Sequence, residues 1–253
     1  MSGHSKWATI KRSKAANDSK RGKVFTKIGR EIVIAVREGG PDPDSNFSLR
    51  VVLDKARAAN MPKDNIERAI KRGSGELKGE AELVEAFYEG YGTQGTAIIV
   101  QTLTDNRNRT VSEVRHMFSR YSGNLGAEGC VAWMFDRKGY ISIDPGDEDP
   151  EEIALVAIDS GAEDVDIGDD IVEVYTLVED FMKVKEALSE AGYEASSAQL
   201  SWLPKTTQAL DERETLQTMK LLEALEDLDD VQEVYSNLDI SDEMIAKFDT
   251  EAA

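Results

Sequence analysis

Lysine and arginine side chains gather near the start of the chain, where they could contact a phosphate backbone. Residues 1–72 hold 17 Lys and Arg against 8 Asp and Glu, a net charge of +9, whereas the remainder holds 13 against 41, a net charge of −28. Cationic side chains neutralise phosphates and release counterions, which gives affinity without sequence readout. This asymmetry predicts a polyanion-binding segment on an acidic body, and the alternative is a set of charges that only solvates a small helical domain.

The spacing of the cations predicts a basic stripe on one helix. Lys20, Lys23, Lys27, Arg30 and Arg37 follow one another at intervals of 3, 4, 3 and 7 residues, on the face opposite an apolar stripe. The residues before this helix lack apolar periodicity and are expected to form a mobile basic arm. The predicted nucleic-acid-binding residues of the arm and the helix are Lys6, Trp7, Lys11, Arg12, Lys14, Lys20, Arg21, Lys23, Lys27 and Arg30. Trp7 could stack on an unpaired base or could anchor the arm on the body.

Two further arginines, Arg107 and Arg109, lie inside the acidic body and complete the predicted set. They belong to a segment, residues 104–110, that joins a predicted strand to a helix with a capping box at Thr110 and Glu113. A helix N-terminus offers unpaired N–H groups, so a phosphate could dock there. The alternative is that both arginines pair with neighbouring acids.

Signals for catalysis, metals and cofactors are weak. Residues 90–95 match G-x-G-x-x-G, but an apolar, strand-like segment follows where a dinucleotide site needs a helix, so a hairpin turn is expected. His4, His116 and Cys130 show no metal-ligand spacing. No Ser/His/Asp set stands out. We therefore predict no catalytic residue, no metal, no cofactor, no small-molecule substrate and no enzymatic activity.

The expected location is the cytoplasm. A single cysteine excludes a disulfide framework within one chain. The first 27 residues are polar and basic, unlike a signal peptide, and no apolar run approaches the ~20 residues of a membrane span. No membrane partner is expected.

The predicted fold class is α+β, and it begins with three helices. Apolar periodicity predicts a helix from Lys20 that ends at Gly39, a second from about Ser45, and a third from Pro62 to Gly73. Three short amphipathic helices can bury one another's apolar stripes. A basic arm and helical bundle are therefore expected over residues 1–78.

Two ferredoxin-like α/β domains should follow, the third domain being inserted in the second. Residues 137–204 read as a complete βαββαβ unit. Residues 79–136 read as ββαβ, with a last strand at Val131–Phe135, and residues 205–240 supply the missing helix and strand of a split domain. Residues 241–253 remain as a C-terminal tail.

Several motifs resemble those of the YebC/PmpR family over essentially the whole chain. They are Gly3-His4-Ser5-Lys6-Trp7, Lys23-Val24-Phe25-Thr26-Lys27, Tyr88-Glu89-Gly90-Tyr91-Gly92, Asp105-Asn106-Arg107-Asn108-Arg109-Thr110, Gly123-Asn124-Leu125-Gly126, Gly161-Ala162-Glu163-Asp164 and Asp229-Asp230-Val231-Gln232-Glu233-Val234-Tyr235. The resemblance implies a three-domain cytoplasmic regulator of gene expression. Ser13 stands where histidine is frequent, and Cys130 where serine is common.

Three functions stay open at this stage. Bacterial relatives carry the label of DNA-binding transcriptional regulators, and the family also resembles a mitochondrial translational activator of cytochrome c oxidase and ribosome-linked bacterial proteins. The charge distribution favours a ribosome-associated translation factor that contacts ribosomal or transfer RNA, because an acidic body resists lying along free DNA. The third hypothesis is an acidic protein–protein adaptor without a direct nucleic-acid role.

Overall fold

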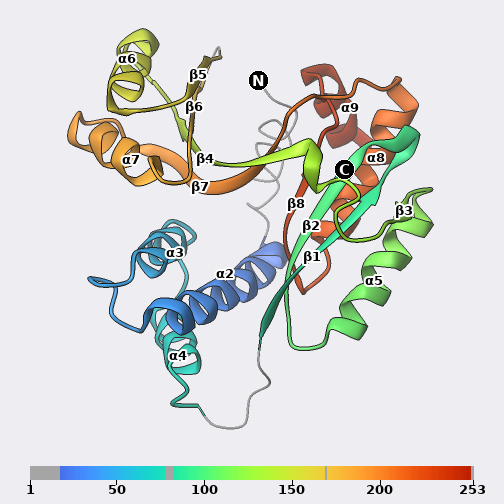
Figure 1. Cartoon of the computed structure of the whole chain (residues 1–253), viewed down its shortest axis with the longest axis horizontal. Coiled ribbons are helices and arrows are strands. Elements are labelled where there is room, and N and C mark those ends of the chain that lie inside the picture. Colours follow the sequence, from blue (N-terminus) through green and yellow to red (C-terminus); the bar gives the residue numbers. More distant parts are fainter. Residues whose placement is uncertain (1–17, 78–82, 169, 252–253) are drawn as a thin grey trace.

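The computed structural model describes residues 18–77, 83–168 and 170–251. Its first part is a helical domain in which α2 lies against two shorter helices (Figure 1). The bounds are α2 (Asp18–Gly39), α3 (Phe47–Ala58) and α4 (Lys63–Gly73). Ile28, Ile32, Leu49 and Ala56 form the centre of its core and are each at most 1% exposed. The three helices predicted from apolar periodicity are confirmed.

A buried asparagine closes the turn between α2 and α3. The Asn46 side-chain amide donates to the carbonyls of Ala35 and Gly40, and its oxygen accepts from the Leu49 amide as the N-cap of α3. Gly40 has φ of 86°, which a residue with a Cβ adopts at a cost. These local bonds end the long basic helix and turn the chain back across it.

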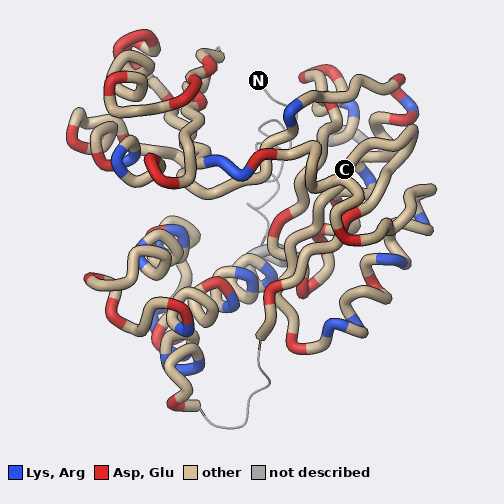
Figure 2. The backbone as a smooth tube through the Cα atoms, in the orientation of Figure 1, with Lys and Arg blue, Asp and Glu red and all other residues tan. Residues whose placement is uncertain are grey.

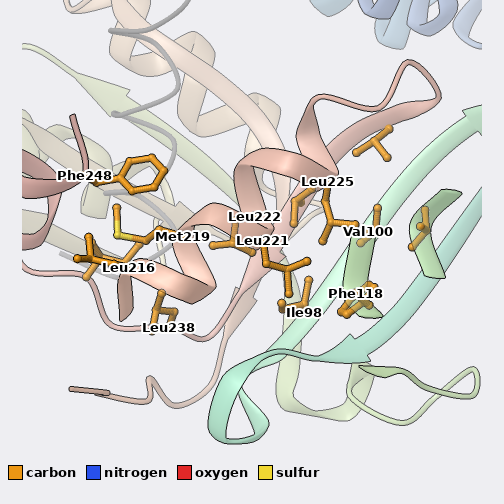
Figure 3. Close-up of a cluster of buried hydrophobic side chains, with 14 residues drawn as sticks. Ile98, Val100, Phe118, Leu216, Met219, Leu221, Leu222, Leu225, Leu238 and Phe248 are labelled. Carbon is orange, nitrogen blue, oxygen red and sulfur yellow. The ribbon is translucent and has the colours of Figure 1, made fainter. Parts of the chain in front are cut away.

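The second part is a four-stranded antiparallel sheet with two helices on one face. Its strand order is β3-β1-β2-β8. The elements are β1 (Val84–Tyr91), β2 (Ala97–Thr104), α5 (Arg107–Arg120), β3 (Asn124–Leu125), α8 (Glu212–Glu226) and β8 (Val231–Ser236). Figure 3 shows the core between α8 and this sheet, including Ile98, Val100, Phe118 and Leu222. The C-terminal segment forms α9 (Asp242–Glu251), whose Phe248 joins the same core.

The third part interrupts the second between β3 and α8. Its elements are β4 (Phe135–Ile143), α6 (Pro150–Ser160), β5 (Asp164–Ile167), β6 (Val172–Thr176), α7 (Phe181–Glu190) and β7 (Ala195–Pro204). The strand order β5-β6-β4-β7, all antiparallel, is that of a ferredoxin-like sheet. The predicted α+β class and the inserted third domain are therefore confirmed. The domain boundaries stay predictions, and the one at residue 136 falls within β4.

Two local predictions are wrong. The predicted strand Val131–Phe135 is a 3₁₀ turn, η2 (Ala132–Met134), followed by the start of β4. The buried Glu89 carboxylate holds this turn by accepting from the amides of Gly129, Val131 and Ala132, at 2.7, 2.8 and 2.8 Å. The fourth strand of the second sheet is β3 instead.

The predicted capping box at Thr110 is also wrong, because α5 begins four residues earlier than this N-cap implies. Asn106 is the N-cap, and its side chain accepts from the Arg109 amide. Thr110 is instead buried in the first turn of the helix and donates to Asp230. A tertiary partner, absent from any local pattern, decides the role of this threonine.

The G-x-G-x-x-G segment forms a strand–turn–strand connection, as expected. The 3₁₀ turn η1 (Thr93–Gly95) joins β1 to β2, and Tyr91 pairs with Ala97 across the hairpin. Gly95 has φ of 80°. Over the described ranges, no helix combines the length and apolarity that crossing a bilayer demands.

Candidate nucleic-acid interface

For seven of the twelve predicted site residues, the structure describes either no atom or no side chain. Lys6, Trp7, Lys11, Arg12 and Lys14 belong to residues 1–17, which are outside the described residues. Lys20 and Arg21 lie in the first turn of α2, outside the part of the chain whose side chains are described.

The described cations of the basic stripe contact the second domain, although Lys23 and Arg37 are also exposed to solvent. We call residues Glu226–Asp230, at the end of α8, the acidic turn. Lys23 Nζ lies 3.1 Å from Asp227 Oδ1, and Lys27 Nζ donates to the Glu226 carbonyl at 2.9 Å. Arg30 donates to the Asp229 carbonyl and lies 3.0 Å from Asp230 Oδ1. Arg37, about two turns further along α2, donates to the Leu83 carbonyl.

The acidic turn attracts these cations for two reasons. Glu226 and Asp227 end α8, so their carbonyls lie at the negative end of the helix dipole. Asp230 adds a carboxylate whose side chain is only 2% exposed. Burial alone would raise the pKa of Asp230, but hydrogen bonds from Arg109, Thr110 and Thr104, with the Arg30 charge, hold this pKa below its ordinary value.

The second predicted phosphate site, at the start of α5, is surrounded by acids. Arg109 binds Asp105 at 2.8 Å and Asp230 at 2.7 Å, and Arg107 donates to the Glu85 carbonyl at 3.3 Å. A hollow of about 450 Å³ lies there, and its charged lining consists of Arg30, Arg109, Asp105, Glu113, Asp227, Asp229 and Asp230. Five carboxylates against two guanidinium groups disfavour a phosphate at this place.

A different hollow, between α2 and α4, has the opposite charge. We call it the α2–α4 groove. It measures about 440 Å³ and is lined by Gly22, Phe25, Thr26, Gly29, Arg30, Val33, Met61, Asn65, Arg68, Ala69 and Arg72. Three of these residues are arginines and none is an acid. Arginine pairs with phosphate oxygens in two-point geometry, so this lining suits a nucleic-acid backbone.

Two of the groove arginines, Arg68 and Arg72, were missed by the sequence analysis. They stand four residues apart on α4 and therefore share a face of that helix. Gly22 and Gly29, seven residues apart on α2, are two positions without a side chain on the opposite wall, which also carries Phe25 and Arg30. The signal in the sequence was this pair of spacings, one in each helix, which only gains meaning once the two helices are known to lie side by side.

The outer side of α4 continues the cationic surface. Arg68 and Lys71 are exposed, and neither makes an ion pair with any carboxylate in the described ranges. Figure 2 shows Lys and Arg on all three helices of the first domain, whereas acids prevail around α6 and β5. The basic and acidic segments of the sequence therefore also lie in different parts of the folded molecule.

A third hollow lies where the three domains meet. It measures about 250 Å³, and α2, α3, β1, β2, β4, β7 and β8 contribute to its lining. Gln232 lines it from a bulge in β8 and is 3% exposed, and neither its amide nitrogen nor its oxygen has a hydrogen-bond partner among the described residues. Burial raises the pKa of the neighbouring Tyr235 well above its ordinary value. Within the described ranges, no three His, Cys, Asp or Glu side chains are grouped to hold a metal ion.

Comparison with known sequences assigns the chain along most of its length. Residues 5–76 match the TACO1/YebC protein N-terminal domain, and residues 83–238 match the TACO1/YebC second and third domain. A "probable transcriptional regulatory protein" of Dehalococcoides mccartyi is 51% identical over 252 residues and covers 100% of both chains. One of Herpetosiphon aurantiacus is 53% identical over 249 residues, covering 98% of each chain.

A solved structure has the same fold. The crystal structure of a conserved hypothetical protein from Aquifex aeolicus superposes with a TM-score of 0.83 and 48% sequence identity, covering 89% of this chain and 93% of the other. Both sequence matches and the shared three-part architecture lead to one assignment, and the chain belongs to the TACO1/YebC family.

Proposed function

We propose that the protein is a non-enzymatic regulator of gene expression that binds nucleic acid through its first domain, with the α2–α4 groove and the outer side of α4 as the contact surface. Relatives about half identical over the full chain are named probable transcriptional regulatory proteins, which supports a regulatory role. The observation that carries the proposal is the groove lined by Arg30, Arg68 and Arg72 without a carboxylate.

The groove chemistry favours an unpaired strand. Guanidinium groups bind phosphates, and the half-buried Phe25 ring in the lining offers a face for a base to stack on. The body behind the first domain carries a net charge of −28 and would repel a duplex running along the whole molecule. We therefore favour RNA as the ligand and a ribosome-associated translation factor as the function. The second candidate is a DNA-binding transcriptional regulator, which the names of the relatives support.

The test reverses two charges that the fold does not use. The variant Arg68→Glu/Lys71→Glu is compared with Arg115→Glu/Arg213→Glu, which makes the same charge change at exposed positions of the second domain. Fluorescence anisotropy measures binding to a labelled single-stranded RNA and to a duplex DNA over a range of salt. We expect the first variant to bind at least about tenfold more weakly and to lose ~0.7 of salt slope per single-strand phosphate contact removed.

The control variant should bind within about twofold of the unmodified protein. Equal losses in both variants would show that net charge alone governs binding and would overturn the groove as the contact surface. Preference for RNA or DNA in the same titrations separates the two candidate functions, and crosslinking in growing cells identifies which of them the first domain touches.

A further inference from the structure

Arg30 belongs to two surfaces at once. It lines the α2–α4 groove on one side and binds Asp229 and Asp230 of the acidic turn on the other. Lys23 and Lys27, on the same stripe, contact Asp227 and Glu226 of that turn. We propose that the acidic turn occupies the basic stripe of α2 as an internal substitute for a phosphate backbone, and that a nucleic acid displaces it, so that the first domain separates from the second on binding.

The acidic turn presents oxygens as a phosphate backbone does. Three successive cations of α2 meet oxygens from four turn residues, namely the carbonyls of Glu226, Asp227 and Asp229 and the carboxylates of Asp227 and Asp230. Each contact is one that a phosphate oxygen could replace without change of donor. The stripe predicted to bind nucleic acid is therefore the one that the acidic turn covers.

Long polar side chains, and not a shared apolar core, hold the first domain on the second. The main apolar clusters of the two domains have no common member, and the one residue of the second-domain range in the first-domain cluster is Leu83, directly before β1. Lys55, which lies 3.8 Å from Glu233, adds another charged contact. Separation along this interface exposes charged groups to water and opens neither core.

The first domain also makes an apolar contact with the third domain. Phe47, at the start of α3, packs against the cluster that includes Ile141, Val174 and Phe181. This contact can persist as a pivot while α2 leaves the acidic turn, because Phe47 contacts the third domain whereas Lys23, Lys27 and Arg30 contact the second. Ionic strength weakens the exposed Lys23–Asp227 pair and spares the apolar pivot.

The acidic turn and a nucleic acid compete for the same cations of α2, so each weakens the binding of the other. A nucleic acid shifts the equilibrium towards the separated form only by its greater affinity for that form. Its apparent affinity for the protein is reduced in proportion to the fraction of molecules in the separated form. Removing negative charge from the acidic turn should therefore tighten nucleic-acid binding although the turn touches no nucleic acid. This inference rests on the proposed function and adds its regulation.

A binding experiment tests the competition. Asp227→Asn/Asp229→Asn neutralises two exposed acids of the turn and leaves the buried Asp230 in place. Its control, Asp147→Asn/Asp159→Asn, makes the same charge change at exposed positions of the third domain. With the same single-stranded RNA, we expect the turn variant to bind three- to tenfold more tightly than the control. Equal affinities of the two variants would overturn the inference.

A distance measurement tests the separation. With Cys130→Ser, spin labels are attached at Ala58→Cys on α3 and Ser119→Cys on α5, both exposed positions. Addition of RNA should lengthen and broaden the distance distribution measured by double electron–electron resonance. RNA that binds without changing the distances overturns the inference and leaves the proposed function intact. RNA that binds neither the labelled nor the unlabelled protein overturns the proposed function itself.

Discussion

At the scale of single residues, Asp230 connects parts of the molecule that lie far apart in the sequence. Its carboxylate accepts from Arg109, Thr104 and Thr110 and lies against Arg30 of the first domain. One buried charge thus fixes the start of α5, the end of β2 and the docking of α2. Such a carboxylate is stabilised only while its partners remain.

Replacement of Asp230 by Asn should lower the free energy of unfolding by about 3 kcal/mol at pH 7, because Arg30 and Arg109 lose a buried partner. Asp105→Asn, which removes the exposed partner of Arg109, should cost less than about 1 kcal/mol. Urea unfolding followed by circular dichroism measures both. Equal costs would contradict the central role of Asp230.

The contribution of Asp230 to stability depends on pH. Because the pKa of Asp230 lies below its ordinary value, ionisation stabilises the folded protein above about pH 4. This contribution is lost as the pH falls from about 4 through the folded pKa. The stability difference between the unmodified protein and Asp230→Asn should therefore shrink below pH 4, and a constant difference down to pH 2 would exclude ionisation as its cause.

At the scale of elements, the close approach of α4 to α2 shapes the groove. A Cβ at Gly73 would lie 2.7 Å from the Val36 Cβ and 2.8 Å from the Val33 carbonyl oxygen, which belongs to backbone. The glycine that ends α4 therefore sets how near the two helices come. For Gly22, on the groove side of α2, no atom of the described part of the chain lies within 4 Å of such a Cβ.

These two glycines should respond to alanine in opposite directions. Gly73→Ala is expected to destabilise the first domain by about 1–3 kcal/mol because α4 must move away from α2. Gly22→Ala should stabilise it by up to about 1 kcal/mol because alanine favours the helix and meets open space. Thermal unfolding distinguishes them, and a neutral Gly73→Ala would show that the contact between the helices yields without cost.

At the scale of the whole molecule, one side chain joins the first domain to the third by apolar contact. Phe47 is half-buried against the third-domain cluster, and Arg50 lies over its ring with a guanidinium carbon 5.9 Å from the centroid. Lys23, Lys27, Arg30 and Lys55 connect the first domain to the second through charged side chains. The relative placement of the three domains thus depends on ionic strength and on this phenylalanine.

Phe47→Ala should enlarge the radius of gyration measured by small-angle X-ray scattering at 0.5 M salt more than at 0.05 M salt, because the screened charged contacts then hold the first domain alone. The helical content should remain unchanged, since the first-domain core does not include Phe47. Leu77→Ala, at an exposed residue of the same domain, is the control. A radius independent of salt in the Phe47 variant would contradict this account.

Local elements, the α+β class with its inserted domain, and the segregation of charge could all be predicted from the amino-acid sequence. Apolar periodicity, turn residues and charge are properties of short segments, so α2, α3, α4 and the ferredoxin-like unit could be predicted from them. Val131–Phe135 and Thr110 failed because Glu89 and Asp230, their actual partners, are distant in the sequence.

The partners that the cations contact follow from the tertiary structure alone. Lys23 and Asp227 are 204 residues apart, and no segmental pattern pairs them. Lys23, Lys27 and Arg30 of the basic stripe contact the acidic turn. Arg68 and Arg72 line the groove because α4 packs on α2. Charges interact through space over about 8 Å at physiological ionic strength, so the partners of a charged side chain are set by the fold and not by the order of residues along the chain.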